Sequence, residues 1–204
     1  MNGARLALVG VMIAGGIATG CAHLPASGLP GPTPSPSESS TPTPLPSGSG
    51  SCTTQASTTT VTIVMSAGVA ATPDPRFGVI SGYTTLSSTG TFSNVATVIT
   101  AHPTDIVQFA NIEAGATPIF HSAVGFPGAS FPPVPYTFPA AAQRPVGTAI
   151  TSALWSTGRV APSPDGGVSF CFSQQFTLQN GTWYFGDLDY YNLANMRDVI
   201  VVAP

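Results

Sequence analysis

The 204-residue chain carries few charges: it has no lysine, five arginines and eight acidic residues, for a formal net charge of −3 at pH 7. Without a basic patch it cannot neutralise a series of phosphates, which excludes nucleic-acid binding as its main function. Serine, threonine, asparagine and glutamine must supply its polar surface. This composition favours β-sheets with hydroxyl-rich outer faces over charged amphipathic helices.

The sequence also lacks the short motifs of common enzyme classes. It contains no nucleophile-elbow serine motif, no His-Glu-x-x-His zinc motif and no glycine-rich phosphate loop. Asp187 and Asp189 are separated by one residue, and this spacing alone does not establish the facing carboxylates of a glycosidase. We therefore expect a protein that is not an enzyme.

No apolar run is long enough to cross a bilayer. Arg5 precedes an apolar stretch over residues 6–17, and small residues follow it. A transmembrane helix needs about 20 apolar residues. The layout of a positive charge, a short apolar run and small residues instead predicts a cleaved export signal over residues 1–20.

Ala18, Thr19, Gly20 and Cys21 resemble the lipobox of bacterial lipoproteins, in which the cysteine thiol receives a diacylglyceryl group. Ala18 departs from the pattern, because leucine is usual at its position. The resemblance implies a chain lipidated at Cys21 and anchored to a membrane on the periplasmic side or at the cell surface. The alternative is an ordinary secretory signal, and with either signal the mature chain leaves the cytosol.

Cysteine is scarce, with three residues in the whole chain. If Cys21 carries lipid, Cys52 and Cys171 remain as an even pair in an oxidising compartment. A disulfide between them would close a long loop and stabilise the fold by about 2–5 kcal/mol. The alternative is two separate thiols, with Cys171 buried between its phenylalanine neighbours.

Residues 21–51 are rich in proline, serine, threonine and glycine. Such a segment cannot build a core, and proline favours extended polyproline II structure, so we expect a semi-rigid tether. The remaining residues, 52–204, have the length of a single domain.

The predicted domain contains no stretch with helical periodicity over three turns, and only residues 140–143 suggest a single helical turn. Short β-branched or alternating segments recur between glycine, proline and asparagine. They predict an all-β fold, an antiparallel β-sandwich of about eight strands. The expected strands are residues 58–65, 78–85, 95–100, 106–111, 149–155, 168–172, 182–185 and 198–202.

Two segments, residues 105–111 and 120–126, resemble the cupredoxins, the family of plastocyanin and azurin, and the second contains a histidine at the position of the family's first copper ligand. Residues 154–158, 176–178, 181–185 and 196–202 follow the order of the family's late strands. The resemblance covers the chain from about residue 58 to the C-terminus and implies a Greek-key sandwich. An insertion over residues 127–145 is longer than in small members.

The type 1 copper site of that family uses two histidine nitrogens, a cysteine thiolate and usually a weak axial methionine. By resemblance, His121 matches the first histidine and Met196 falls at the position of the methionine. Asp187 occupies the position of the cysteine. Tyr190 or Asn192, depending on the loop spacing, occupies that of the second histidine. The resemblance therefore implies a degenerate copper site.

The degenerate site leaves three hypotheses open: blue copper, another metal site, or no metal. His121 with the oxygen donors Asp187 and Asp189 could bind a divalent ion, including Cu(II), in a non-blue site. Asn192 and Met196 are further candidate ligands. Cys171 lies on the strand before the expected ligand position, so pairing with Cys52 is the better use of its sulfur. We expect no cofactor, with copper as the alternative.

The loop after residue 185 concentrates polar and aromatic side chains. Asp189, Tyr190 and Tyr191 are candidates for contact with a partner or a sugar, because loops at the end of a sandwich commonly display binding groups. The alternative is that the tyrosines cap the core. We expect His23 to be solvated in the tether and His102 to have a structural role in a turn.

These observations favour a monomeric, non-catalytic binding or scaffolding module at the cell envelope. Its expected partners are the membrane, through the lipid anchor, and an envelope protein or carbohydrate. The alternative is a copper-binding or electron-transfer protein, as the cupredoxin resemblance implies.

Overall fold

β-branched and aromatic segments separated by glycine and proline form short strands throughout the part of the chain that the computed structural model describes. The described residues are 51–53, 61–114, 117–165 and 169–204, and all of them fall within one unit of the chain. The expected signal peptide, the lipidation at Cys21 and nearly all of the tether lie outside them. In the described ranges, no helix has the length and apolar character needed to cross a membrane.

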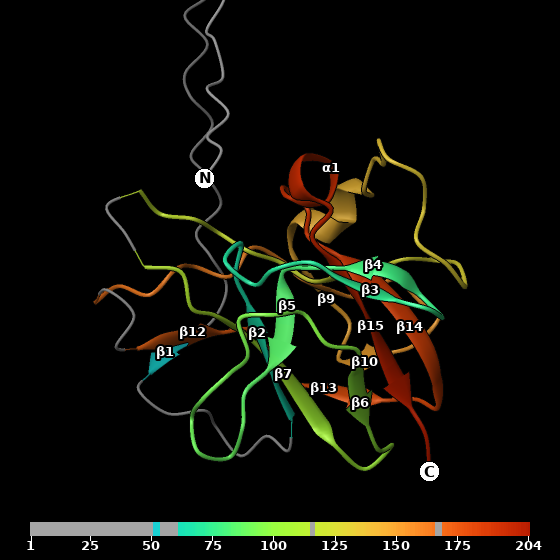
Figure 1. Cartoon of the computed structure of the whole chain (residues 1–204), viewed down its shortest axis with the longest axis horizontal. Helices are drawn as coiled ribbons and strands as arrows, with labels where there is room; N and C mark the ends of the chain where they lie inside the picture. The colour runs from blue at the N-terminus through green and yellow to red at the C-terminus, as the bar shows by residue number, and fades with distance from the viewer. Residues whose placement is uncertain (1–50, 54–60, 115–116, 166–168) are drawn as a thin grey trace, which may run out of the picture. The chain divides into compact units, whose positions relative to one another are not determined.

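Two large sheets make up this unit (Figure 1). One has seven strands: β1, β12, β7, β13 and β10 follow one another, while β2 pairs with β5 and β7. The other has six strands in the order β6-β15-β14-β8-β11-β9, and β3 and β4 form a separate hairpin. The strands are β1 Ser51–Thr53, β2 Val61–Met65, β3 Thr72–Asp74, β4 Gly78–Ile80, β5 Tyr83–Thr85, β6 Ile99–Ala101, β7 Ile106–Asn111, β8 Val124–Gly125, β9 Pro145–Val146, β10 Ala149–Ile150, β11 Ser156–Thr157, β12 Phe170–Phe172, β13 Phe176–Leu178, β14 Gly181–Gly186 and β15 Arg197–Val202.

The predicted all-β sandwich is confirmed, but its sheets are mixed. The pairs β2–β7, β6–β15 and β10–β13 are parallel, whereas β14 pairs with both β8 and β15 in antiparallel register. Parallel neighbours cannot be joined by a tight turn. The chain therefore crosses repeatedly from one sheet to the other, as the connections of a Greek-key sandwich require.

The core lies between the two sheets. Phe109 on β7 packs against Phe176 of the same sheet and against Phe185 of the opposite sheet, with ring centroids 6.1 and 5.6 Å apart. Trp155, which is 1% exposed, stacks on Phe109 at 5.9 Å. Buried aromatic pairs of this kind stabilise a core by about 0.5–1.5 kcal/mol each beyond their buried area.

Several predicted strands are shorter than expected: only residues 99 and 100 of the expected strand 95–100 lie in β6, and β12 begins at Phe170. The segment 78–85 divides into β4 and β5 at Gly82, whose φ is 82°. A Cβ atom at that position would lie 2.2 Å from Cγ of Met196, so both the conformation and the space require glycine. In the segment 149–155 only Ala149–Ile150 pairs as a strand.

Two short helical turns lie in the unit. The expected turn over residues 140–143 is confirmed as the 3-10 helix η1, Ala140–Gln143. The α-helix α1, Tyr191–Ala194, was not predicted, because four residues are too few to show periodicity. Figure 1 shows α1 beside the segment that contains η1, at one end of the unit.

The predicted disulfide between Cys52 and Cys171 is confirmed. The two residues are direct partners in the antiparallel register of β1 and β12, so strand pairing itself brings the sulfur atoms together. The bond spans 119 residues of sequence, and Cys171 is 1% exposed. The alternative of two separate thiols is not realised.

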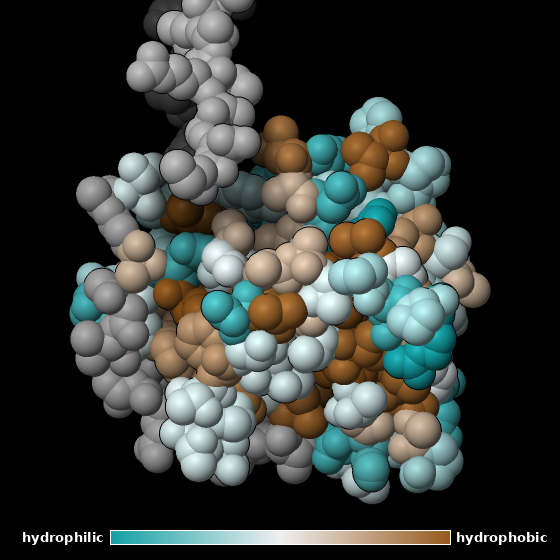
Figure 2. Space-filling view, viewed as in Figure 1, coloured by the Kyte–Doolittle hydropathy of each residue, from teal (hydrophilic) through white to brown (hydrophobic). Residues whose placement is uncertain are grey.

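The surface agrees with the scarcity of charge. Figure 2 shows apolar patches dispersed among weakly polar and hydrophilic residues on the visible face. Among the described residues, arginine forms ion pairs with carboxylates at two places, Arg76 with Asp74 and Arg159 with Asp189. Few charged side chains are therefore available to form surface ion pairs, as the composition indicates.

A buried carboxyl group on β15 gives the first testable prediction. Asp198 is fully buried, and its Oδ2 has no hydrogen-bond partner among the described residues. Burial raises the pKa of Asp198 well above its usual value of 3.8, against the hydrogen bond from the Val199 amide. In the unfolded chain the group ionises at lower pH, so stability must fall as pH rises from about 4.

We expect Asp198→Asn to remove this fall, because the amide stays neutral. At pH 7 the variant should be more stable than the unchanged protein by about 1 kcal/mol or more, and at pH 3 the two should agree. Urea unfolding at several pH values measures both. If the free energies of unfolding of the two proteins differ by the same amount at every pH, residue 198 does not carry a buried neutral carboxyl group.

Candidate functional site

His121 is held in place by an isolated antiparallel backbone bridge to Val160. It lies just before β8, and its amide donates to the Val160 carbonyl at 3.2 Å while the Val160 amide donates back at 2.7 Å. Its side chain is fully buried. A buried imidazole must find hydrogen-bond partners for both ring nitrogens, and these partners define the site.

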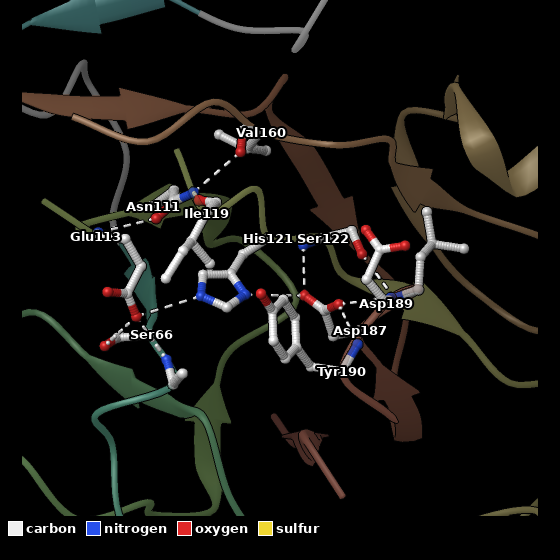
Figure 3. Close-up of polar contacts among 12 residues, drawn as sticks. Ser66, Asn111, Glu113, Ile119, His121, Ser122, Val160, Asp187, Asp189 and Tyr190 are labelled. Carbon is white, nitrogen blue, oxygen red and sulfur yellow. Dashed lines mark hydrogen bonds and ion pairs between the residues drawn. The ribbon is translucent and has the colours of Figure 1, made fainter. Parts of the chain in front are cut away.

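Two carboxylates supply these partners at opposite edges of the ring (Figure 3). Nδ1 of His121 lies 3.1 Å from Oδ2 of Asp187, and Nε2 lies 3.3 Å from Oε1 of Glu113. We call these three residues the His121 triad. Both nitrogens act as donors when the ring is protonated, so the geometry is that of an imidazolium held between two anions.

The charges of the triad follow from this geometry. Burial alone would lower the pKa of His121, but the hydrogen bonds to Asp187 and Glu113 outweigh burial and raise the pKa to about 9. The hydrogen bond from His121 lowers the pKa of Glu113 to about 2. At neutral pH the imidazolium is therefore positively charged, and it neutralises only part of the surrounding negative charge.

Asp187 is fixed by backbone donors as well as by His121. Its Oδ2 accepts the Ser122 amide at 2.8 Å, and its Oδ1 accepts the amides of Asp189 and Tyr190 at 2.8 and 2.9 Å. Aspartate commonly starts a turn by accepting amides two and three residues ahead. The same side chain therefore binds the imidazole and shapes the loop that leads into α1.

Glu113 is fixed in a similar way from the opposite side. Its Oε1 accepts the Ser66 hydroxyl at 2.8 Å and the Ala67 amide at 2.7 Å. The Glu113 amide in turn donates to Oδ1 of Asn111 at 2.9 Å, and the Asn111 amide group donates to the Val160 carbonyl at 3.0 Å. The triad thus joins the segment after β2, the segment after β7 and the loop after β14.

The structure brings together only some of the residues suggested as metal ligands. Asp187 contacts His121 directly, whereas the exposed Asn192 exchanges hydrogen bonds of 2.8 and 2.9 Å with the backbone of Tyr136. The Met196 side chain is buried against Gly82. Asn192 is therefore bound to the 127–145 insertion and not to His121.

The residues present do not fit a type 1 copper centre. The sulfur of Cys171 is bonded to Cys52 and offers no thiolate, and His121 is the one imidazole at the site within the described ranges. In the described part of the chain, no group of three histidine, cysteine, aspartate or glutamate side chains is arranged to hold a metal ion. Glu113 and Asp187 face opposite edges of the ring, so they cannot converge on one ion with it.

The candidate binding loop divides into buried and accessible members. Tyr191 is fully buried, packs on Phe126 with ring centroids 5.0 Å apart, and donates its hydroxyl hydrogen bond to the Pro132 carbonyl. A role for Tyr191 in contacting a partner therefore does not fit, and the capping alternative describes it better. Asp189 and Tyr190 remain partly exposed.

Tyr190 covers the triad from outside. Its ring centroid lies 5.1 Å from that of His121, with the planes inclined by 55°. This contact places an aromatic ring beside a protonated imidazole, where the negative potential of a ring face is favourable to a cation. Burial and the carboxylates of Asp187, Asp189 and Glu113 raise the pKa of the Tyr190 hydroxyl, which therefore stays protonated.

Sequence reasoning missed Glu113 and Arg159. Glu113 lies eight residues before His121 in an irregular segment, and Arg159 lies 30 residues before its partner Asp189. Neither spacing matches a motif. The available signal was the scarcity of charged residues in this chain. Because so few occur, each charged residue in the domain is a candidate for a specific ion pair.

Comparisons with known proteins add a structural likeness. No protein-family model matches the chain, and no curated protein matches it. Among solved structures it is similar to reduced rusticyanin, with 17% sequence identity, a TM-score of 0.36, and coverage of 70% of this chain and 77% of that chain. A sequence identity and a TM-score this low do not allow a metal site or a function to be inferred for this chain.

The charge of His121 gives the second prediction. The stabilising effect of Glu113 is complete above its unfolded pKa of 4.5 and is lost as pH falls through about 2. The stabilising effect of His121 is complete below its unfolded pKa of 6.5 and is lost as pH rises through about 9. The triad should therefore stabilise the fold most between about pH 4.5 and 6.5.

We expect His121→Gln to lower the free energy of unfolding at pH 6 by about 3–5 kcal/mol, because it removes the cationic partner of the buried Asp187 side chain. The loss of stability between pH 6.5 and 9 should shrink in the variant. His102→Gln, at an exposed turn position, is the matched control and should change neither. An NMR titration in which the His121 ring loses its proton near pH 6 would disprove the charged triad.

Proposed function

We propose that this chain is a lipid-anchored extracytoplasmic protein whose cupredoxin-like sandwich acts as a non-catalytic binding module without a copper centre. The single observation that carries the proposal is the His121 triad. At the position that the cupredoxin resemblance assigns to a copper ligand, both ring nitrogens are hydrogen-bonded to buried or half-buried carboxylates.

The proton on His121 also opposes metal binding at the non-blue site considered from the sequence. A metal must displace a proton whose pKa is about 9. At pH 7 this competition weakens the apparent affinity about 100-fold relative to a free imidazole lone pair. The metal would also have to break the hydrogen bond to Asp187 or the one to Glu113.

The Cys52–Cys171 disulfide supports an extracytoplasmic location, because disulfides persist in oxidising compartments and are rare in the cytosol. The expected lipobox at Cys21 supports membrane anchoring. The described domain is composed of short strands and loops with the candidate side chains at one end of the sandwich, an arrangement suited to display of a binding surface.

Copper titration tests the absence of a copper centre. We expect the purified protein to bind neither Cu(II) nor Cu(I) stoichiometrically at pH 7 and to develop no intense blue thiolate band. His121→Ala should change thermal stability and leave the titration unchanged. One equivalent of tightly bound copper that is lost in His121→Ala, with the fold intact by circular dichroism, would overturn the proposal in favour of a copper protein.

Lipid labelling tests the anchor. Cells expressing the full chain should incorporate radioactive palmitate into it, and mass spectrometry should find a mature chain that begins at lipidated Cys21. Cys21→Ser should remove the label and release the protein from the membrane fraction, while Cys52→Ser should keep the label. Labelling that persists in Cys21→Ser, or a mature N-terminus elsewhere, would contradict lipidation at this residue.

A further inference from the structure

A depression of about 310 Å³ lies outside the His121 triad, where Tyr190 covers the imidazole. Among the described residues, its lining consists of Pro118, Phe120, Arg159, Asp189 and Tyr190. Two aromatic side chains, a proline and an arginine–aspartate pair therefore meet around one opening. Sites for small molecules combine apolar walls with a few fixed polar groups in this way, and their volumes start at roughly 300 Å³.

The arginine and aspartate are locked together at the surface. Nε and Nη2 of Arg159 donate to the two carboxylate oxygens of Asp189 at 2.8 and 2.7 Å, and Nη1 donates to the side-chain oxygen of Gln143. The Arg159 side chain is 20% exposed and that of Asp189 is 38% exposed. In a bidentate pair of this kind, the guanidinium N–H donors and the carboxylate oxygen acceptors have fixed positions next to one another, and here both side chains are accessible to solvent.

The charges of this pair select against charged ligands. A cation would be repelled by Arg159, and an anion would be repelled by Asp189 and by the carboxylates of the triad below. Adjacent donor and acceptor groups instead match a ligand whose hydroxyl groups both donate and accept. A pair of neighbouring hydroxyls on a neutral sugar ring has this property.

Tyr190 supplies the remaining features of such a site. Its ring is partly exposed and held in place, since its amide donates to Asp187 and its ring lies against the His121 ring and the edge of the core. Within the described ranges, its hydroxyl makes no hydrogen bond, so it is free to bind a ligand. Tyrosine offers a large apolar face with a polar tip, which suits the apolar C–H face and the rim hydroxyls of a sugar.

We propose that this depression binds a neutral carbohydrate, with one sugar ring against Tyr190 and Phe120 and its hydroxyls on Asp189 and Arg159. The inference rests on the proposed function, because it gives the binding module a ligand class. It gives the triad a second role as well: by fixing the Asp187 side chain, His121 fixes the backbone of both Asp189 and Tyr190.

Calorimetric titration of the mature, detergent-solubilised protein tests the proposal with four probes. Chitohexaose and cellohexaose are neutral, the glucosamine hexamer is cationic, and oligogalacturonate is anionic. We expect at least one neutral hexamer to bind with a Kd of about 10 μM to 1 mM, and the charged oligomers to bind at least about tenfold more weakly.

Variants assign the binding to this depression. Tyr190→Ala should weaken binding about tenfold, whereas Tyr190→Phe should keep most of it because the ring remains. Arg159→Gln should also weaken binding, by about fivefold or more, since it removes the donors beside Asp189. Phe92→Ala removes an exposed aromatic ring outside the depression and should have no effect.

Three results would overturn the carbohydrate site: no binding of either neutral hexamer, stronger binding of a charged oligomer, or equal affinity in Tyr190→Ala and the unchanged protein. Thermal unfolding of each variant identifies a loss of affinity caused by misfolding, and Tyr190→Phe gives an independent measurement if Tyr190→Ala does not fold. A protein that is lipidated and free of copper but binds no neutral sugar would refute this inference and leave the proposed function standing.

Discussion

A protonated imidazole between two carboxylates is the interaction on which one end of this sandwich depends. His121 contacts Asp187 on one edge and Glu113 on the other, and each carboxylate accepts further amide hydrogen bonds from its own surroundings. Three segments far apart in the sequence are thereby fixed relative to one another. Such a buried network contributes little net stability compared with an apolar core, but breaking one partner is costly.

The same network explains why the site cannot easily be converted into a metal centre. A type 1 centre needs lone pairs that point toward a common position, whereas the triad directs protons outward from one ring to two anions. Asn192 forms hydrogen bonds with the backbone of Tyr136, in the insertion over residues 127–145, and Met196 packs beside Gly82. Each of these side chains has a structural role that a bound metal would have to disrupt.

Much of the fold could be predicted from the sequence, because the longer strands of this chain show local patterns of β-branched and aromatic residues. The strand at residues 106–111 was predicted with its exact bounds, and the disulfide followed from counting cysteines. The short strands β1, β3, β8 and β9 were missed, since two or three residues show no alternation. The mixed pairing of the sheets was also missed, because parallel partners are distant in sequence.

The site was predicted less completely. His121 and Asp187 were found through the cupredoxin resemblance, but their direct ion pair was not. A charge-bearing loop residue such as Glu113 gives no local signal of the histidine that it meets across the fold. Tyr190 and Tyr191 look equivalent in sequence, yet the loop begun by Asp187 leaves one at the surface and buries the other. Only the three-dimensional path of the chain separates them.

The position of the disulfide has a mechanical consequence. β1 pairs with the domain through only three residues, so hydrogen bonds alone would let it peel away under load. The covalent bond from Cys52 to Cys171 passes a pull on the N-terminal segment directly into β12, which is paired with the central strand β7. Force would therefore reach the middle of a sheet rather than its edge. If the chain is anchored at Cys21, as we propose, a pull on the anchor would not detach the first strand from the domain.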